Sequence, residues 1–316
     1  MMIETRGLRK SFRTRKGAVE AVRGVDLIVA EGEIFGFLGP NGAGKTTTLR
    51  MLATLLTPDG GDATIAGVDL RRAPGAVRRR IGYVAQGGGT WDEVSAREEL
   101  VMQARLYGLP KAAAGERAEA AIKAFQLGEF ADRPCKTYSG GQRRRVDIAL
   151  GIIHRPMVVF LDEPTTGLDP QSRAHMWDEV RRLRAEGMTV FLTTHYLEEA
   201  DALCDRVAII DNGTIEAEGA PEALKREVAG DVVTVGVNGA APEATALLDG
   251  QPYVHRIEKV EAGLRLYVDA GATAIPQILR TLDRAGVDLG SIELHRPSLD
   301  DVFLTKTGRS LRDAES

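Results

Sequence analysis

The sequence predicts an α/β fold followed by a small α+β domain. Short apolar stretches alternate with helical patterns through most of the chain. A glycine-rich loop stands between one apolar stretch and a helical pattern, and two carboxylates end another apolar stretch. Strands that alternate with helices in this way are typical of a parallel sheet covered by helices.

Composition excludes several classes of protein. The chain has 316 residues, is 43% hydrophobic and carries a formal net charge of −4, so it lacks the charge excess of a nucleic-acid or membrane-surface binder. Its two cysteines, Cys135 and Cys204, are far apart and indicate free thiols in a reducing compartment. The N-terminus lacks the apolar core of a signal peptide, and the aliphatic clusters are too short to span a bilayer. We therefore expect a soluble or peripheral protein, with any membrane role lent by another chain.

The first part of the chain predicts an antiparallel sheet. Short alternating segments cover residues 3–8, 18–22 and 25–29, separated by charged or glycine-containing turns. Phe12 lies here among basic neighbours, and an aromatic ring in such a place is suited to stacking on an adenine near phosphates. A plain surface or edge-of-core phenylalanine is equally consistent with the sequence.

The glycine-rich loop matches the phosphate-binding pattern G-x-x-x-x-G-K-[ST]. Glycines let the backbone close around a phosphate with its N–H groups directed inward. Lys45 would then reach the outer phosphates of a nucleotide, and the Thr46 hydroxyl would help to hold Mg²⁺. A predicted strand at 34–38 and a predicted helix at 46–56 flank the loop, so the helix N-terminus faces the phosphates. The loop residues are Gly39, Pro40, Asn41, Gly42, Ala43, Gly44, Lys45, Thr46 and Thr47.

Beyond the loop helix, residues 59–67 predict a hairpin and residues 81–86 a strand that ends in Gln86. Three glycines at 87–89 should make that strand end mobile. Residues 93–128 have a helical pattern without a sustained heptad repeat, which indicates a small helical subdomain and not a coiled-coil arm.

A Ser-Gly-Gly turn precedes the next predicted helix, at 142–153. Such a turn leaves backbone N–H groups free to bind an anion, although taken alone it could be a helix cap. The arginine runs at 78–80 and 143–145 are interpreted as solvated helix faces, with a polyphosphate or partner contact as the minority interpretation. The turn consists of Ser139, Gly140, Gly141 and Gln142.

An apolar strand at 157–161 runs into Asp162 and Glu163. Two carboxylates are costly at such a position unless they meet a cation or take part in chemistry. Given the loop upstream, the economical assignment places Asp162 on Mg²⁺ through water and Glu163 on an attacking water. The alternative is an acidic strand terminus in a solvated loop.

A second βαβ unit follows, with a turn at 167–170, an amphipathic helix at 171–186 and an apolar strand at 188–193. His195 comes directly after this strand. A single histidine at a strand end is more often structural, but this strand should end at the same sheet edge as the Asp162 strand, which favours a role at the phosphates.

Together these motifs resemble those of the ATP-binding subunits of ATP-binding-cassette (ABC) transporters, over about residues 3–229. The resemblance implies a P-loop NTPase fold with an antiparallel β subdomain and a helical subdomain at about 87–150. It also implies that two cassettes, as a homodimer or heterodimer, close head to tail over two ATP molecules. The motifs are the loop at 39–46, Gln86, the signature at 139–142, Asp162, Glu163, the turn at 167–169 and His195.

The same resemblance implies ATP and Mg²⁺ as cofactors, a separate transmembrane permease as partner and a peripheral location on the cytoplasmic face of the cell membrane. Each ATP would lie between the loop of one subunit and the signature of the other. Tyr138 departs from the family, which usually has leucine there, but the Ser-Gly-Gly backbone is intact. The further roles are stacking on adenine for Phe12, contact with Mg²⁺ or the attacking water for Gln86, general base for Glu163, contact across the dimer for Asp169 and contact with the γ-phosphate for His195.

Residues 230–308 have a separate β-α-β-β-α-β pattern, which predicts a small ferredoxin-like or related α+β domain. Its end, at 297–304, resembles the tail of cassettes from daunorubicin-resistance-type drug and antibiotic exporters. This domain could pack on the cassette or the dimer partner, or sense drug directly. A short polar tail follows at 309–316.

The preferred hypothesis is an ATPase subunit that drives export of a drug, antibiotic or lipid-like molecule through a separate permease. An alternative is a soluble ATP-driven clamp on nucleic acid or ribosomes, but such relatives tend to carry two cassettes, a long coiled-coil insertion or zinc-binding cysteines, and this sequence shows none of these. A third hypothesis, drug sequestration, lacks an evident apolar pocket signature. No nucleic-acid partner is expected.

Overall fold

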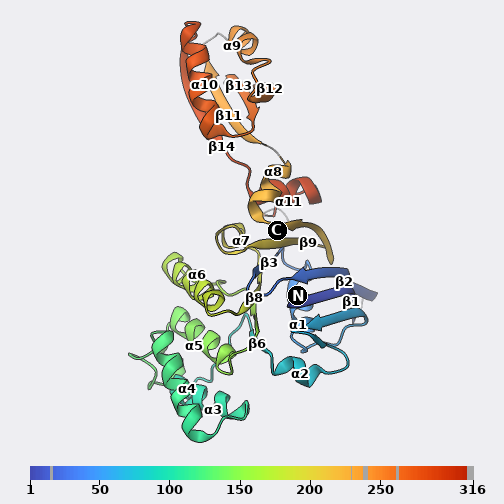
Figure 1. Cartoon of the computed structure of the whole chain (residues 1–316), viewed down its shortest axis with the longest axis vertical. Coiled ribbons are helices and arrows are strands. Elements are labelled where there is room, and N and C mark those ends of the chain that lie inside the picture. The colour runs from blue at the N-terminus through green and yellow to red at the C-terminus, as the bar shows by residue number, and fades with distance from the viewer. Residues whose placement is uncertain (15–16, 229, 238–240, 261–262, 312–316) are drawn as a thin grey trace. The chain divides into compact units, whose positions relative to one another are not determined.

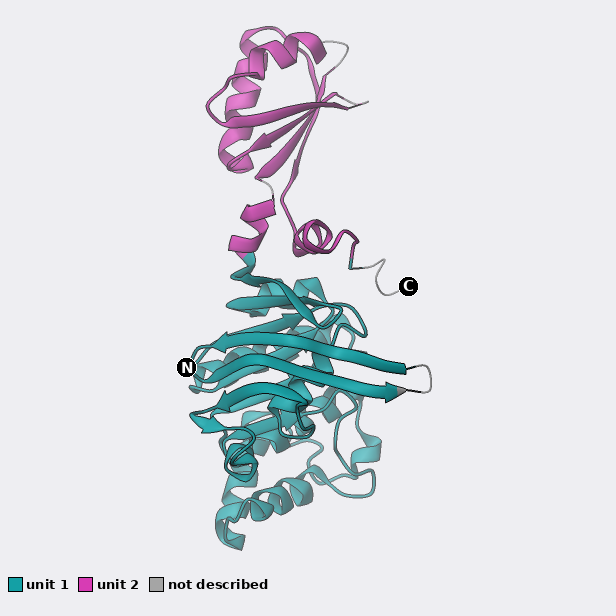
Figure 2. Ribbon diagram, turned by 90° about the vertical axis from the view of Figure 1, so that its right-hand side faces the viewer, with its two compact units in different colours: residues 1–221, 311–316 teal, residues 222–310 magenta. Residues whose placement is uncertain are grey.

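The computed structural model describes residues 1–14, 17–228, 230–237, 241–260 and 263–311. The last five residues of the expected tail therefore lie outside the described residues. Contacts divide the chain into two compact units (Figure 2). Unit 1 comprises Met1–Pro221 with Leu311–Ser316, and unit 2 comprises Glu222–Ser310.

A six-stranded sheet forms the centre of unit 1 (Figure 1). Strands β9, β3, β8, β7 and β6 are parallel, and β10 adds an antiparallel edge. In spatial order the strands are β10 (Thr214–Gly219), β9 (Arg206–Asp211), β3 (Ile34–Leu38), β8 (Thr189–Thr194), β7 (Val158–Asp162) and β6 (Ile81–Val84).

The central strands are buried on both faces, as their continuous apolar sequences predict. Every residue of β3, β7 and β8 is buried. Phe191 of β8 lies at the centre of this core, with its ring 5.6 Å from the rings of Phe35 and Phe37 and 5.7 Å from that of Phe160. The rigid packing of these strands fixes the positions of the residues that follow their carboxyl ends.

An antiparallel sheet of four strands also belongs to unit 1. The three short segments predicted for residues 3–29 are in fact two long strands, and shifts in their pairing register interrupt the alternation of apolar and polar residues. The predicted hairpin at 59–67 is present as β4 and β5. In spatial order the strands are β2 (Gly17–Val29), β1 (Ile3–Thr14), β4 (Gly60–Ile65) and β5 (Val68–Asp69).

Helices of unit 1 occur in all four predicted helical regions, and two short helices, α2 and α7, were not predicted (Figure 1). The predicted helix at 46–56 is wrong at its C-terminal end, because Thr54 has a φ of 61° and the chain leaves the helix after Leu52. Within the described residues, no helix combines the length and apolar composition needed to cross a bilayer. The helical elements are α1 (Lys45–Leu52), α2 (Pro74–Arg78), α3 (Ala96–Leu106), α4 (Lys111–Ala124), the 3₁₀ turn η1 (Cys135–Thr137), α5 (Gly140–Ile152), α6 (Pro170–Ala185) and α7 (Leu197–Leu203).

Unit 2 has the predicted β-α-β-β-α-β order, with all strand pairs antiparallel in the spatial order β12-β13-β11-β14. This is the ferredoxin-like arrangement. Val233, Val235, Leu266 and Ile278 belong to its apolar core, which forms between the sheet and helices α9 and α10. Its elements are α8 (Pro221–Val228), β11 (Asp231–Val237), α9 (Ala241–Leu248), β12 (Val254–Val260), β13 (Gly263–Val268), α10 (Gly271–Arg284), β14 (Leu289–His295) and α11 (Leu299–Thr307).

Candidate functional site

The candidate site lies at the carboxyl ends of four neighbouring strands. Strand β3 leads into loop 39–47, β6 leads to Gln86, β7 ends in Asp162 and is followed by Glu163, and β8 leads to His195. Because these strands are parallel neighbours in the order β3-β8-β7-β6, the residues after them gather at one sheet edge. Open α/β sheets bind ligands at this edge.

Two glycines of the loop have no room for a side chain. A Cβ at Gly39 would lie 2.2 Å from the carbonyl oxygen of Ile210, and one at Gly44 would lie 2.4 Å from the carbonyl oxygen of Ala21. Gly44 also caps α1 with a φ of 107°, in the left-handed region. Because the first N–H groups of α1 have no acceptors within the helix, this end of the loop is suited to an anion such as phosphate.

The Lys45 side chain is buried inside the loop, with 4% of its surface exposed. Its Nζ donates to the carbonyl oxygens of Gly39 at 2.6 Å and Pro40 at 3.1 Å, and it lies 3.4 Å from Glu163 Oε1. The ammonium group therefore stands between the glycine-rich loop and the carboxylate of Glu163. A cation in this position can form charge-assisted hydrogen bonds with phosphate oxygens on one side and with the carboxylate on the other.

The two carboxylate oxygens of Asp162 differ in their hydrogen bonding. Its Oδ1 accepts hydrogen bonds from the hydroxyls of Thr46 at 2.9 Å and Thr193 at 2.8 Å. Its Oδ2 is buried and has no hydrogen-bond partner among the described residues. A buried orphan carboxylate oxygen beside a threonine hydroxyl fits Mg²⁺, which takes one or two carboxylates and completes its shell with phosphates and water. The described residues contain no group of three or more His, Cys, Asp or Glu side chains arranged for a metal.

Glu163 is the centre of the network. Its Oε2 accepts hydrogen bonds from Gln86 Nε2 at 2.9 Å and Thr166 Oγ1 at 3.1 Å, and it lies 3.3 Å from His195 Nδ1. Since Lys45 approaches the other oxygen, side chains from four separate loops converge on one carboxylate. The structure thus brings together the residues that the sequence predicts as catalytic.

The backbone and the ionisation of Glu163 are both unusual. Its φ of 45° lies in the left-handed region, and its N–H is held by the Thr193 hydroxyl at 3.0 Å and carbonyl at 3.2 Å. Burial alone would raise the pKa of Glu163, but the close approach of His195 and the charge of Lys45 outweigh it and lower the pKa to about 2. The carboxylate is therefore ionised at neutral pH.

Thr193 is a site residue that sequence reasoning missed. Its hydroxyl both donates to Asp162 and accepts from the Glu163 N–H, so it links the two carboxylate residues. The signal in the sequence is a hydroxyl residue at the fully buried end of an apolar strand. A buried hydroxyl in such a place needs polar partners, and the neighbouring strand end supplies them.

The Ser-Gly-Gly segment forms the N-terminus of α5. Ser139 Oγ accepts from the Gln142 N–H at 3.3 Å, and Gln142 Oε1 accepts from the Ser139 N–H at 3.0 Å, which makes a capping box. A Cβ at Gly141 would meet Ser172 Oγ at 3.0 Å, so the segment packs closely on the start of α6. Asp169 caps α6, because its side chain accepts from the Ser172 N–H at 2.9 Å. The hydrogen bonds from the N–H and hydroxyl of Ser172 lower the pKa of Asp169. This second group is separate from the network around Glu163.

Phe12 lies on β1, where it pairs with Val19 and is 39% exposed. The Lys10 ammonium lies 5.7 Å from the centre of its ring. The sequence prediction of an aromatic ring beside a cation is therefore matched locally. The exposed ring has the surface that stacking on an adenine requires.

Tyr138, the departure from the family pattern, has its own set of partners. The side chain is buried, and its hydroxyl donates to the carbonyl oxygens of Phe130 at 2.8 Å and Arg133 at 3.0 Å. The hydroxyl also accepts from the Ala96 N–H at 3.3 Å, and burial raises the pKa of Tyr138 to about 12. Tyr138 therefore connects the signature to the start of α3 and to the segment that contains Phe130 and Arg133.

The prediction of a solvated face for the arginine run at 143–145 is wrong for Arg144. This side chain is 6% exposed and donates to backbone carbonyl oxygens. The signal that sequence reasoning missed is the position of Arg144 on the same helix face as the buried Asp147. The run at 78–80 is exposed, as predicted.

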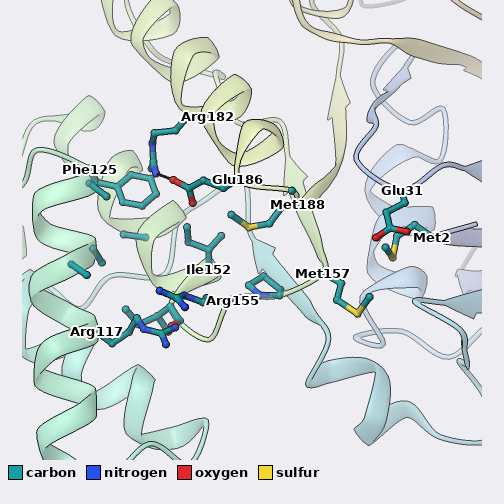
Figure 3. A pocket seen from close by; sticks show the side chains of 17 residues that line it. Met2, Glu31, Arg117, Phe125, Ile152, Arg155, Met157, Arg182, Glu186 and Met188 are labelled. Carbon is teal, nitrogen blue, oxygen red and sulfur yellow. Dashed lines mark hydrogen bonds and ion pairs between the residues drawn. The ribbon is translucent and has the colours of Figure 1, made fainter.

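A separate cavity of about 630 Å³ lies at the opposite ends of the strands (Figure 3). Arg155 and Met157, which precede β7, and Met188, which precedes β8, line it together with residues of α4 and α5. The groups around Glu163 follow the other ends of these strands, so this cavity is not the candidate site.

Two family models match the chain. The model for ABC transporters matches residues 22–166, and the model for the C-terminal domain of DrrA1-3-like ATP-binding proteins matches residues 219–307. The first match includes the glycine-rich loop, the signature and the β7 carboxylates. The second includes all the strands of unit 2.

Relatives match along almost the whole chain. The daunorubicin/doxorubicin resistance ATP-binding protein DrrA of Streptomyces peucetius is 44% identical over 98% of this chain and 94% of the relative. The doxorubicin resistance ATP-binding protein DrrA of Mycobacterium tuberculosis (strain ATCC 25618 / H37Rv) is 43% identical over 97% and 94%. The linearmycin resistance ATP-binding protein LnrL of Bacillus subtilis (strain 168) is 33% identical over 99% and 100%.

Solved structures resemble the cassette part. The ATP-binding subunit of an ABC transporter is 27% identical with a TM-score of 0.63, over 72% of this chain and 93% of that structure. A dimeric ATP-binding cassette in a post-hydrolysis state, bound to ADP and Pi, is 25% identical with a TM-score of 0.64, over 69% and 98%. The predicted α/β fold and ATPase activity are confirmed, and the chain belongs to the family of ATP-binding subunits of ABC transporters.

Proposed function

We propose that this ATPase powers the export of a drug, antibiotic or lipid-like molecule through a separate transmembrane permease. The names of the relatives, which are resistance ATP-binding proteins for daunorubicin, doxorubicin and linearmycin, support this cargo class. The match of unit 2 to a DrrA1-3-like domain supports the same subfamily. With a permease partner, the protein would work at the cytoplasmic face of the cell membrane as a peripheral subunit.

The proposed nucleotide site uses the groups at the carboxyl ends of β3 and β7. Loop 39–47 would surround the phosphates, with Lys45 on the outer ones. Thr46, Asp162 and Gln86 would hold Mg²⁺, and the orphan Oδ2 of Asp162 supports this assignment. When bound, Mg²⁺ would neutralise charge on the phosphate oxygens. Phe12 would stack on the adenine.

In the proposed hydrolysis step, the oxygen of a water attacks the γ-phosphorus, the bond to the β-phosphate oxygen breaks, and Glu163 accepts the proton of the water. Glu163 is ionised at neutral pH, so it can accept that proton, and Gln86 and His195 fix its orientation. A pKa of about 2 makes it a weak base. Movement of Lys45 towards the phosphates would remove one of the charges that lower this pKa, and would make the carboxylate more basic.

The proposed assembly is a head-to-tail dimer of cassettes, either with a second copy or with a close relative. Each ATP would be completed by residues 139–142 of the opposite subunit, with Asp169 at the contact. The dimeric solved cassettes at 25% and 26% identity support dimerisation. Loss of the γ-phosphate would then remove the link between the halves and let them open.

The observation that carries the proposal is the convergence of Gln86, Lys45, Thr166 and His195 on the Glu163 carboxylate. The test is Glu163→Gln, measured by size-exclusion chromatography and by phosphate release with MgATP. We expect turnover to be lost and an ATP-bound dimer to accumulate. A monomer at saturating ATP, or turnover equal to that of the wild type, would contradict the proposal.

The clamp on nucleic acid or ribosomes is not favoured, because the relatives described above carry resistance names over nearly the full length of the chain. Binding to duplex DNA or ribosomes that weakens steeply with salt would be needed to restore it.

A further inference from the structure

We propose that Arg144 and Asp147 are positioning residues, which tie the signature helix α5 to the peptides around Gln86 and Glu163 and so hold the hydrolytic pair in register. This inference rests on the roles proposed above for Gln86 and Glu163. It adds two residues that act through the backbone groups beside Gln86 and Glu163.

The Arg144 guanidinium lies between the ends of strands β6 and β7. Nη1 donates to the carbonyl oxygen of Ala85 at 2.5 Å, Nη2 to that of Asp162 at 3.2 Å, and Nε to that of Pro164 at 2.9 Å. Ala85 directly precedes Gln86, while Asp162 and Pro164 flank Glu163. One planar group therefore holds peptides next to both members of the Gln86–Glu163 hydrogen bond, whose length is 2.9 Å.

Only arginine can make this set of contacts. A guanidinium has five N–H donors in a rigid plane, whereas a lysine ammonium is a single point that cannot reach carbonyls on two strands together. Burial lowers the pKa of Arg144, and the negative charges of Asp147 and Asp162 oppose that shift. The three carbonyl oxygens compensate the buried charge further.

Asp147 holds the other side of Gln86. It lies three residues after Arg144 on α5, so the two side chains share a helix face. Its Oδ1 accepts from the Gly89 N–H at 2.8 Å, and a Cβ at Gly88 would lie 2.7 Å from its Oδ2. Two of the three glycines that the sequence predicts as mobile, Gly88 and Gly89, therefore contact a buried carboxylate, and Gln86 has α5 contacts both before and after it.

These contacts make α5 a rigid link. Its N-terminus is the signature at 139–142, and its next turns carry Arg144 and Asp147. A shift of the signature as it engages a nucleotide on the opposite subunit would therefore move the peptides beside Gln86 and Glu163. Four hydrogen bonds carry this coupling: three that Arg144 donates and one that Asp147 accepts.

The main experiment compares Arg144→Lys with Arg145→Lys. Arg145 is next on the same helix and donates to the carbonyls of Phe125 and Gln126 at 3.4 Å, away from Gln86. We expect kcat for MgATP hydrolysis to fall roughly 10- to 100-fold in Arg144→Lys, because a small misplacement of catalytic groups has effects of that size. The affinity for ATP should be unchanged, and Arg145→Lys should stay close to wild type. Equal kcat values for Arg144→Lys and wild type would overturn the proposal.

A double-variant cycle with Gln86→Ala separates positioning from general destabilisation. If Arg144 acts through the Gln86–Glu163 pair, Arg144→Lys should reduce kcat less in the Gln86→Ala background than in the wild type. Fold-changes that multiply independently would contradict this. If Glu163→Gln keeps full turnover, the proposed function fails; if it loses turnover while Arg144→Lys does not, only the present inference fails.

Asp147 provides a second pair of variants in case Arg144→Lys does not fold. Asp147→Asn keeps an oxygen for the Gly89 N–H, whereas Asp147→Ala removes it. We expect Asp147→Ala to speed hydrogen exchange at Gly89 and to lower kcat, and Asp147→Asn to restore most of both. Faster exchange at Gly89 with an unchanged kcat would refute the link between the loop and hydrolysis.

Discussion

The two units of the chain differ in what they bury. Among the described residues of unit 2, the buried side chains are apolar, and the polar ones lie at least partly exposed. Unit 1 buries charged groups from strand ends, loops and helices. They are Glu33, Lys45, Glu99, Arg144, Asp147, Asp162, Glu163, Glu199 and Asp211.

Buried charges are costly unless they are paired or used in chemistry, so this contrast places the candidate catalytic groups in unit 1. In unit 1 the carboxylates at the sheet edge have close partners: Asp162 accepts from the Thr46 hydroxyl, and Glu163 accepts from Gln86 and lies 3.4 Å from the Lys45 ammonium. In unit 2 the stability comes from apolar contacts between one sheet face and two helices. Substitutions of the buried charged groups at the sheet edge should therefore affect turnover, and substitutions in the apolar core of unit 2 should affect stability alone.

The largest effect is expected from Lys45→Ala. Removing a buried cation that faces both the loop carbonyls and Glu163 should lower kcat/KM for MgATP by about 10²- to 10³-fold, the range for one preorganised electrostatic contact. Lys306→Ala in unit 2 is the control and should leave phosphate release unchanged. Comparable losses in both variants would remove the distinction between the units.

Leu266→Ala tests unit 2 from the other side. Leu266 is fully buried in the core of that unit, so its truncation should lower the free energy of unfolding by about 2–5 kcal/mol. Urea denaturation followed by circular dichroism measures this loss. The ATPase rate below the unfolding transition should remain close to wild type, and a rate as low as that of Lys45→Ala would show that unit 2 takes part in catalysis.

The pH dependence of stability should reveal the contribution of the Glu163 carboxylate. Its pKa is about 2 in the folded chain against 4.5 in the unfolded one, so its ionised form stabilises the fold above pH 4.5 and this contribution disappears as the pH falls towards 2. Glu163→Gln should therefore be less stable than wild type at pH 7, by roughly 1.5–3 kcal/mol for a charged hydrogen-bonded group. Urea midpoints of the nucleotide-free proteins should converge on acidification; a constant difference would contradict the assignment.

The smallest effect is expected from Tyr138→Phe. The loss of one hydroxyl with three backbone partners should destabilise unit 1 by about 1–2 kcal/mol, with little change in kcat. Tyr267→Phe in unit 2 is the matched control, because that hydroxyl has a single side-chain partner, Glu258, at 3.0 Å. Thermal unfolding should show the larger decrease in Tm for Tyr138→Phe, and the reverse order would contradict the role given to this tyrosine.

The sequence predicted those parts of the fold and site that depend on local order. Loop 39–47 and the carboxylates after β7 follow directly from strands whose apolar sequences mark their ends. The ferredoxin-like order of unit 2 follows from six elements in the order strand, helix, strand, strand, helix, strand. In such cases the covalent sequence carries the geometry, because parallel strands bring their carboxyl ends to one edge.

Features that depend on contacts distant in sequence were not predicted. Arg144 looked like one member of a solvated run, and its burial depends on carbonyl oxygens that follow two other strands. The helix after the loop was extended too far, because Leu55 and Leu56 continue its apolar pattern although Thr54 has left the helical region. The long strands β1 and β2 looked like short segments because their bulges shift the alternation.

The left-handed backbone of Glu163 has a consequence for how the protein can evolve. The left-handed backbone of a non-glycine residue destabilises the fold by roughly 1–3 kcal/mol relative to a relaxed conformation. Glycine would suit the turn better than glutamate does, yet it would carry no proton acceptor. Fold stability would favour glycine at position 163, whereas the proposed hydrolysis step requires glutamate there. The chain has the residue that this step requires.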